Sequence, residues 1–557
     1  MNLVFSRRPE MKFMQSLRPS SFCAAALLAA AILCLSPAPA SAQLVADGAT
    51  NTLFGDPGGE QDIGTNIVGS VIVGTNGSFT SLILTDNFTL TNSGDSYIGY
   101  NLGANSNRVT VDSSLWDNPG YNITVGRNGS WNTLLITNYG DVFNLAGYIG
   151  VGSDSNQVTV TGFGSSWHSS AEIKIGNLGS FNNLLIVNEG RVENTDAFIG
   201  YGSGIDPAVG KYNQVTVTGA NSLWANTGEL HVGEYGQLNS LLISNGGQVE
   251  NSQGYIGRFS DNNHVSVTGS GSRWTNSGLL TLGGNANTLL INSGGTVTSS
   301  GGTVDGFNNQ VTVSGLNSAW TNSGPLTLVG GENTLLITNG GTVANSDGTF
   351  DSDNNQVTVS GLNSVWNNSG ALAVGNYYSF NTLLINGGGR VEANSQSIIG
   401  NQGNFNQVTV ADGGSVWTNG GDLTVGYYGS DNTLLITNGG RVEVNSQSST
   451  GNPGDNNHVI VTGFGSVWSN GVAVLLGNSG ADNTLLVTAS GAVQSPLVTI
   501  GNSINLTSGS LLTVSDGTLT ATGGGGTGVL DVPYGELVFN GGTITADRLP
   551  KRGSPVL

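Results

Sequence analysis

The chain has 557 residues, of which 88 are glycine, 37% are apolar and only 9% are charged. Its steady supply of Val, Leu and Ile argues against a disordered chain, because disorder requires a shortage of apolar residues to bury. The formal net charge is −20, and an acidic chain repels phosphate backbones, so nucleic acid is not expected as a partner.

The first segment, residues 1–42, is typical of a secretory signal peptide. A basic start is followed by the apolar run "FCAAALLAAAILCL" and by small residues that end in Ala40-Ser41-Ala42, an A-x-A cleavage pattern. The run is shorter than the roughly 20 residues of a spanning helix. We therefore expect cleavage after Ala42, export, and no integral membrane span in the mature chain. Both cysteines, Cys23 and Cys34, lie within this segment.

The segment that follows the leader, residues 43–80, is expected to cap the N-terminal end of the structure. From residue 81 to residue 505 the chain repeats itself, and residues 506–557 are expected to form a last coil and a tail. Eight tryptophans mark the long repeat, and Trp131 alone falls outside their series: Trp116, Trp167, Trp224, Trp274, Trp320, Trp366, Trp417 and Trp468. The block "NQVTVTGFGSSW" (156–167) alternates with blocks such as "NTLLITNYGDV" (132–142), so each long repeat contains two shorter units.

Each short unit contains three stretches in which apolar and polar residues alternate, which is the period of a strand with one buried face. Clusters of Gly, Asn and Ser separate the stretches, as turns require. Three strands and three turns in about 25 residues predict one coil of a parallel β-helix, which must stack on its neighbours to bury its apolar face. The fold class is therefore predicted to be all-β: a right-handed, three-sided parallel β-helix of about 17 coils. A β-propeller would need antiparallel blades, and it would not explain why the half-repeats resemble each other.

An asparagine heads almost every unit. An amide donates and accepts hydrogen bonds at once, so stacked asparagines are predicted to bond to one another in a ladder along the coils. Tryptophan in one unit alternates with Val in the next, which indicates an inward position where large and small side chains interleave. The structural ladder is represented by Asn156, Asn213, Asn309, Asn333, Asn355 and Asn432.

Units of the form "NTLLITNGGRVEVNS" and "NQVTVTGxGSxWxNSG" resemble the repeats of bacterial autotransporter passengers and of exported PEP-CTERM proteins, over about residues 66–505. The resemblance implies a secreted or surface-displayed β-helix of a bacterium, extracellular or associated with the outer membrane, and often adhesive. The C-terminal "ADRLPKRGSPVL" contains neither the amphipathic strands of a translocator barrel nor an apolar sorting helix. The resemblance therefore leaves the route of anchoring open.

Candidate catalytic and metal-binding residues follow the repeat rather than depart from it. Three of the four recurring glutamates, Glu193, Glu250, Glu392 and Glu443, belong to "RVE" triplets, which predict outward pairs of opposite charge. None of the four histidines, His168, His231, His264 and His458, has the spacing of a metal pair. Aspartates near the turns lack the nonapeptide calcium pattern, which favours ordinary turn chemistry over a Ca²⁺ site. We therefore expect no catalytic residue, no cofactor and no metal.

A strip of leucines is the candidate contact surface. Leu135, Leu242, Leu336 and Leu435 lie between the two inward positions of alternate units, and Thr takes this position in the units between. Leucine facing water in every second coil would form a semi-apolar strip that contacts surface glycans, proteins or a second copy of the chain, unless a loop covers it. The predicted function is a structural, adhesin-like scaffold that mediates surface contact or self-association. A carbohydrate-active β-helix enzyme, a polysaccharide lyase or hydrolase, is the alternative.

Overall fold

The computed structural model describes residues 47–54, 64–67, 69–206, 209–501 and 509–550. The predicted signal peptide and both cysteines lie outside the described residues. No described segment forms a helix with the length and apolar character that crossing a membrane requires.

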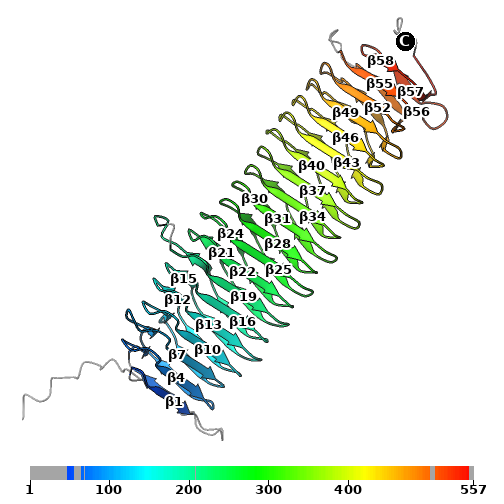
Figure 1. The fold of residues 1–557 in the computed structure, drawn as a ribbon. Helices are drawn as coiled ribbons and strands as arrows, with labels where there is room; N and C mark the ends of the chain where they lie inside the picture. Colours follow the sequence, from blue (N-terminus) through cyan, green and yellow to red (C-terminus); the bar gives the residue numbers. More distant parts are fainter. Residues whose placement is uncertain (1–46, 55–63, 68, 207–208, 502–508, 551–557) are drawn as a thin grey trace, which may run out of the picture. The chain divides into compact units, whose positions relative to one another are not determined.

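The described residues form strands β1 to β59, which build three parallel sheets. A typical coil contributes β10 (Thr133–Thr137) to the first sheet, β11 (Asp141–Asn144) to the second and β12 (Gly147–Val151) to the third. The chain then turns into β13 (Gln157–Thr161), which pairs with β10 in parallel. Figure 1 shows this stacking for the first sheet from β1 to β58, with the sequence colours running from blue to red. The prediction of an all-β, three-sided parallel β-helix is confirmed.

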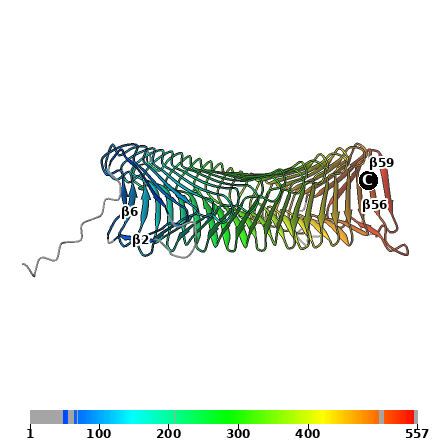
Figure 2. The same cartoon turned by 90° about the horizontal axis from the view of Figure 1, so that it is seen from below.

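Equivalent residues of successive coils stand in register. Leu134 pairs with Val158 in the first sheet, and Tyr148 pairs with Lys174 in the third. In the view of Figure 2, β2 and β6 belong to the first coils and β56 and β59 to the last ones. Every position of the repeat therefore generates a row of side chains along the stack, either inside the β-helix or on one of its outer faces.

Over the described residues the β-helix has about 19 turns, whereas the sequence predicted 17. The additional strands lie at the two ends, where the repeat is degenerate. At the N-terminal end, β1 (Thr50–Phe54) pairs with β4 (Ser81–Thr85). At the C-terminal end, β58 (Glu536–Phe539) pairs with β55 (Leu511–Ser515). Backbone pairing requires no particular side chain, so these coils form without the asparagine and tryptophan by which coils were counted.

The interior is filled by aliphatic side chains and by the eight periodic tryptophans, all of which are 0% exposed. Trp167 stands in register between Val142 and Val192, so a large side chain alternates with a small one along the row. A buried indole N–H must be paired, and Trp224 donates its own to Asn194 Oδ1 at 2.8 Å. Equivalent bonds run to an asparagine one coil earlier for Trp116, Trp167, Trp274 and Trp366.

The unit-heading asparagines form a buried ladder. The backbone N–H of Asn156 donates to Asn182 Oδ1 at 2.9 Å, and the Asn182 N–H donates in turn to Asn213 Oδ1 at 2.9 Å. The same backbone-to-amide bond joins Asn309 to Asn333, Asn333 to Asn355, and Asn432 to Asn457. Each side-chain amide oxygen thus accepts a hydrogen bond from a backbone N–H at a corner of the coil, where this N–H has no partner within a sheet.

The glycine that ends many third-sheet strands is required by this ladder. Gly176 has a φ of +75°, and a Cβ there would lie 2.2 Å from Nδ2 of Asn213. Gly400 has a φ of +70°, and a Cβ there would lie 2.2 Å from Nδ2 of Asn432. The recurring aliphatic-Gly pair is therefore needed because the chain turns directly against a ladder amide.

Candidate functional site

The predicted leucine strip lies on the outer face of the first sheet. Leu135 stands in register between Thr110 and Thr159, and Leu336 is the most exposed of the four at 36%. Leu135, Leu242 and Leu435 are half-buried. The structure thus places all four on one outward row. Their direct neighbours in this row are Thr or Ser, except for Ile460 next to Leu435.

The recurring glutamates lie on the outer face of the second sheet, each beside the arginine of its own strand. Arg390 Nη2 lies 3.1 Å from Glu392 Oε1, and Arg441 Nη2 lies 3.1 Å from Glu443 Oε1. Arg191 pairs with Glu193 in the same way. These side chains are a third to a half exposed, and an exposed ion pair contributes at most ~1 kcal/mol.

A hollow of about 470 Å³ opens beside one of these pairs on the second sheet, among Asp117, Phe143, His168 and Glu193. His168 stacks on Phe143, with ring centroids 4.6 Å apart, and its Nδ1 lies 2.7 Å from Glu193 Oε2. Burial raises the pKa of Glu193, but the hydrogen bond from Arg191 and the charge of His168 outweigh burial and lower it overall. Asp117 and Glu193 are three strand spacings apart, about 14 Å. That separation exceeds the range of a glycosidase carboxylate pair, which ends at about 9.5 Å.

Aromatic and charged side chains also gather on the outer face of the third sheet. We call the outward position in register with Tyr148 the outer row of the third sheet. In the coils up to β24 (Gln253–Ile256) this row holds Tyr97, Thr124, Tyr148, Lys174, Phe198, His231 and Tyr255. In the next coils the same row holds only threonine, at Thr281, Thr303, Thr327 and Thr349.

Cations cover the aromatic rings of this row. Lys174 Nζ lies 5.2 Å from the ring centroid of Phe198 and 4.2 Å from that of Tyr201. The Arg258 guanidinium lies 4.8 Å from the ring centroid of Tyr255, and Arg127 covers an equivalent ring at the start of the row. Such contacts are worth about 0.5–1 kcal/mol each at exposed sites, so they hold the cations close to the surface of the sheet.

Carboxylates line the edge of the row. Glu172 Oε1 accepts a hydrogen bond from the Tyr148 hydroxyl at 3.0 Å and pairs with Lys174 Nζ at 2.9 Å. Burial, followed by the charge of Glu172 and the hydrogen bond to it, raises the pKa of Tyr148 to about 12. Burial and the charge of Glu229 likewise raise the pKa of Tyr255.

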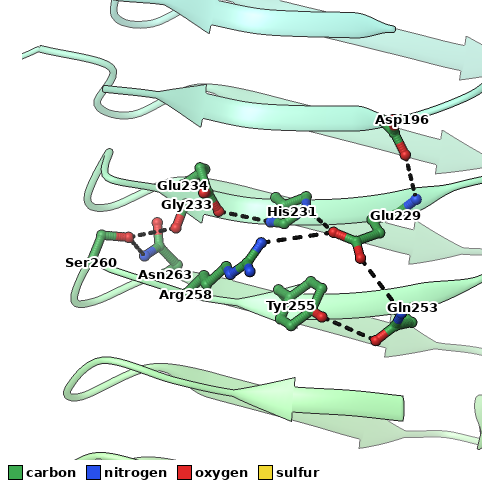
Figure 3. Close-up of polar contacts among 10 residues, drawn as sticks. All are labelled: Asp196, Glu229, His231, Gly233, Glu234, Gln253, Tyr255, Arg258, Ser260 and Asn263. Carbon is green, nitrogen blue, oxygen red and sulfur yellow. Dashed lines mark hydrogen bonds and ion pairs between the residues drawn. The ribbon is translucent and has the colours of Figure 1, made fainter. Parts of the chain in front are cut away.

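His231 lies at the centre of this group (Figure 3), on β21 (Glu229–Glu234). Its ring is stacked between Phe198 and Tyr255, at 4.8 Å on either side. Nε2 lies 3.0 Å from Glu229 Oε2, and Nδ1 lies 2.8 Å from Glu234 Oε2. The contact between Nδ1 and Glu234 does not have the geometry of a hydrogen bond. The His231 side chain is 2% exposed. A histidine covered on both faces and at both nitrogens is not accessible to a substrate, and its ring contacts both carboxylates.

The chain departs from its repeat beside this histidine. The connection after β18 (Ala197–Tyr201) is longer than elsewhere, and residues 207–208 of it lie outside the described part. Its start folds back on β21, where the Gly202 N–H donates to the Glu234 carbonyl at 3.0 Å and Tyr201 forms an antiparallel bridge with Tyr235. In the sequence this insertion appears as the longest interval between two periodic tryptophans, Trp167 and Trp224, and between two unit-heading asparagines, Asn182 and Asn213.

Sequence reasoning overlooked the outer row of the third sheet. The signal was present in the residue before the aliphatic-Gly pair, as in "GYIG", "AFIG" and the "LHVG" that contains His231. The other histidines have separate surroundings: His264 and His458 lie on the first sheet, where each contacts a threonine of the next coil. Within the described residues no group of three or more His, Cys, Asp or Glu side chains is arranged to hold a metal ion.

Comparisons with known proteins add little to these observations. No family model matches the chain, and no curated protein matches it. Among solved structures, the chain is similar to a hyper-glycosylated TibA fragment whose modification was catalysed by TibC. The identity is 11% and the TM-score 0.27, over 77% of this chain and 100% of that one.

Proposed function

We propose that the protein is an exported, adhesin-like scaffold that contacts surfaces through the outer faces of its coils and has no catalytic activity. One observation carries the proposal. The outer row of the third sheet holds aromatic and charged side chains up to β24, whereas the next coils have the same strands, register and interior with threonine in that row. Since the fold forms without these side chains, the partly exposed ones, such as Tyr148 and Tyr255, are available for an external partner.

The surroundings of the row suit binding better than chemistry. Its exposed groups are those that make surface contacts: Arg258 is 40% exposed and Glu229 is 34% exposed, while the edges of Tyr148 and Tyr255 are partly accessible. Aromatic and arginine side chains are enriched at binding surfaces because they bury a large area and still donate hydrogen bonds. The sequence resemblance to autotransporter passengers and PEP-CTERM proteins points to the same role, and to display outside a bacterial cell.

The proposal is tested by a variant that replaces the aromatic residues of the row by the threonine that the next four coils carry: Tyr148→Thr, Phe198→Thr and Tyr255→Thr together. The control, Ile398→Thr with Leu475→Thr, changes half-buried apolar residues of the same row in later coils. We expect the triple variant to bind at least tenfold more weakly to surfaces coated with polysaccharide, with matrix protein or with the chain itself. The control should bind as the parent does, and circular dichroism should report the same β-sheet content in all three proteins. Equal binding by the triple variant and the parent would contradict the role of this row.

A carbohydrate-active enzyme is the alternative that an activity assay separates from the scaffold. Purified protein should release neither reducing ends nor unsaturated products from acidic and neutral polysaccharides. Turnover that Glu392→Gln or Glu443→Gln abolishes would establish an enzyme instead.

A further inference from the structure

A second row of side chains lies immediately before the asparagine ladder, and every described member of it has a positive φ. Small or polar residues adopt this left-handed conformation at most of these corners, for example Ser155, Asn262 and Asp431. Bulky apolar residues adopt it at Phe79, Trp131, Phe181, Tyr212, Leu238, Phe380 and Phe405.

The aromatic members of this corner row are unfavourable for the fold itself. Trp131 has a φ of 63°, Phe181 of 59° and Tyr212 of 55°, a conformation in which the Cβ of an L-residue crowds the backbone. These three residues are 64%, 57% and 49% exposed, respectively, so they add little to the core. Strained residues that packing does not require are characteristic of functional sites.

Trp131, Phe181 and Tyr212 surround one hollow of about 410 Å³. The rings of Phe181 and Tyr212 are stacked, with centroids 4.9 Å apart and planes 9° from parallel. Ser155 occupies the corner between Trp131 and Phe181, so these two aromatic side chains are two strand spacings apart, about 9.6 Å. The small serine therefore leaves a space that is flanked by a ring on either side.

The remaining lining of the hollow is polar and uncharged. Gln157, Asn183 and Gln214 stand in register on adjacent strands of the first sheet and border the aromatic rings. Oδ1 of Asn183 is buried and has no hydrogen-bond partner among the described residues. The acidic side chains of the whole chain exceed its basic ones by 20, yet among the described residues no Asp, Glu, Lys, Arg or His lines this hollow.

We propose that this hollow binds an uncharged oligosaccharide. Sugar rings would pack their apolar faces against Trp131 and against the Phe181–Tyr212 stack, and their hydroxyls would bond to the amides of Gln157, Asn183 and Gln214. A flat ring surface beside amides matches a neutral glycan, because a sugar presents C–H groups on its faces and hydroxyls at its edge. The absence of charge in the lining disfavours an acidic polymer. The inference rests on the proposed surface-contact function and names the chemistry of one partner.

Trp131 provides a direct probe, because the other eight tryptophans are 0% exposed. Quenching of tryptophan fluorescence by iodide should therefore report Trp131 alone. The full mature chain would be titrated with cello-, xylo-, manno- and malto-oligosaccharides of six sugars, and with hexagalacturonate as the acidic counterpart. We expect at least one neutral oligosaccharide to protect Trp131 from iodide, and hexagalacturonate to leave it accessible.

Variants assign the effect to the hollow. Serine occurs naturally in the corner row, so Trp131→Ser, Phe181→Ser and Tyr212→Ser should fold. The matched control is Phe380→Ser, which removes an exposed ring with φ +61° that stacks on Phe405 in a later coil. Isothermal titration should show at least a tenfold loss of affinity for Trp131→Ser and Phe181→Ser, and no change for Phe380→Ser.

Three results would overturn the inference: no neutral oligosaccharide protects Trp131, the acidic one protects it equally, or Phe380→Ser weakens binding as much as Phe181→Ser. The failure of the proposed function has a different signature. Suppose that the parent and Trp131→Ser bind coated surfaces equally well and that the parent binds no oligosaccharide. The surface-contact function then stands, and the oligosaccharide site is refuted. If the parent binds neither surfaces nor sugars, both are refuted.

Discussion

The coils up to β24 and the coils from β27 (Leu279–Leu282) onward have interiors of the same pattern and different exteriors. In both regions buried tryptophan alternates with Val, and the asparagine ladder continues without a break from Asn107 to Asn483. The outer row of the third sheet changes from tyrosine, lysine, phenylalanine and histidine to a run of threonine that extends from Thr281 to Thr349. The interior of a solenoid is thus constrained by stacking, while its exterior varies coil by coil. Function is best sought where the exterior departs from the repeat.

The largest expected effect tests whether the two interiors are equivalent. Trp224→Ala and Trp366→Ala each remove a fully buried indole that donates a 2.8 Å hydrogen bond to an asparagine. Each should lower the free energy of unfolding by about 3–5 kcal/mol, as measured by urea denaturation followed by circular dichroism. A clear difference between the two variants would show that the regions are packed differently.

The ladder should contribute to stability equally in the two regions. Asn213→Ala, Asn333→Ala and Asn432→Ala each leave a buried backbone N–H of the preceding coil without its acceptor. Each should cost about 1–3 kcal/mol in the same denaturation experiment. Thr327→Ala, on the half-buried outer row, is the control that should change little. Asparagine variants that unfold at the same urea concentration as the parent would refute a stabilising ladder.

A smaller effect concerns one difference between the interiors. The indole N–H groups of Trp417 and Trp468 have no partner among the described residues, because Ala393 and Val444 occupy positions where most earlier coils have asparagine. Val444→Asn, nearly equal in volume, should raise the melting temperature by supplying an acceptor worth about 1 kcal/mol.

The reverse change, Asn194→Val, should lower the melting temperature by leaving Trp224 unpaired. Calorimetric scans of both variants would check the pair. A fall in both would mean that packing at these positions outweighs the hydrogen bond.

The smallest effect on stability is expected for the leucine strip, which runs through both regions. Replacing Leu135, Leu242, Leu336 and Leu435 by Thr extends the composition of the intervening coils and leaves every inward side chain in place. The melting temperature should hardly change, whereas self-association measured by light scattering and surface binding should fall. Many weak contacts on one scaffold add through effective concentration. An unfolded quadruple variant would mean that these leucines are part of the core.

The sequence by itself determined the fold class, because its pattern repeats in every coil. The alternation within strands, the turn residues and the tryptophan intervals all recur because equivalent positions of successive coils stack on one another. The sequence of one unit therefore predicts that of the next. The end coils were undercounted because the strands around Thr50 and Glu536 lack the asparagine and tryptophan that mark the other coils. Their backbone pairs without those residues, and Leu53 and Leu537 pack against the core in their place.

Only the tertiary structure decided which outward side chains contact one another. Phe198, His231 and Tyr255 are separated by 33 and 24 residues, yet they stack directly because a coil of any length adds one strand spacing. Trp131 and Phe181 likewise come to face each other across Ser155 only when the connections between strands close. Inward side chains repeat because each must fit against the adjacent coil, and this constraint can be recognised in the amino-acid sequence. Outward side chains do not have to pack against the adjacent coil, so they follow no repeat. Their neighbours depend on the register of the stacked coils, which only the folded structure shows.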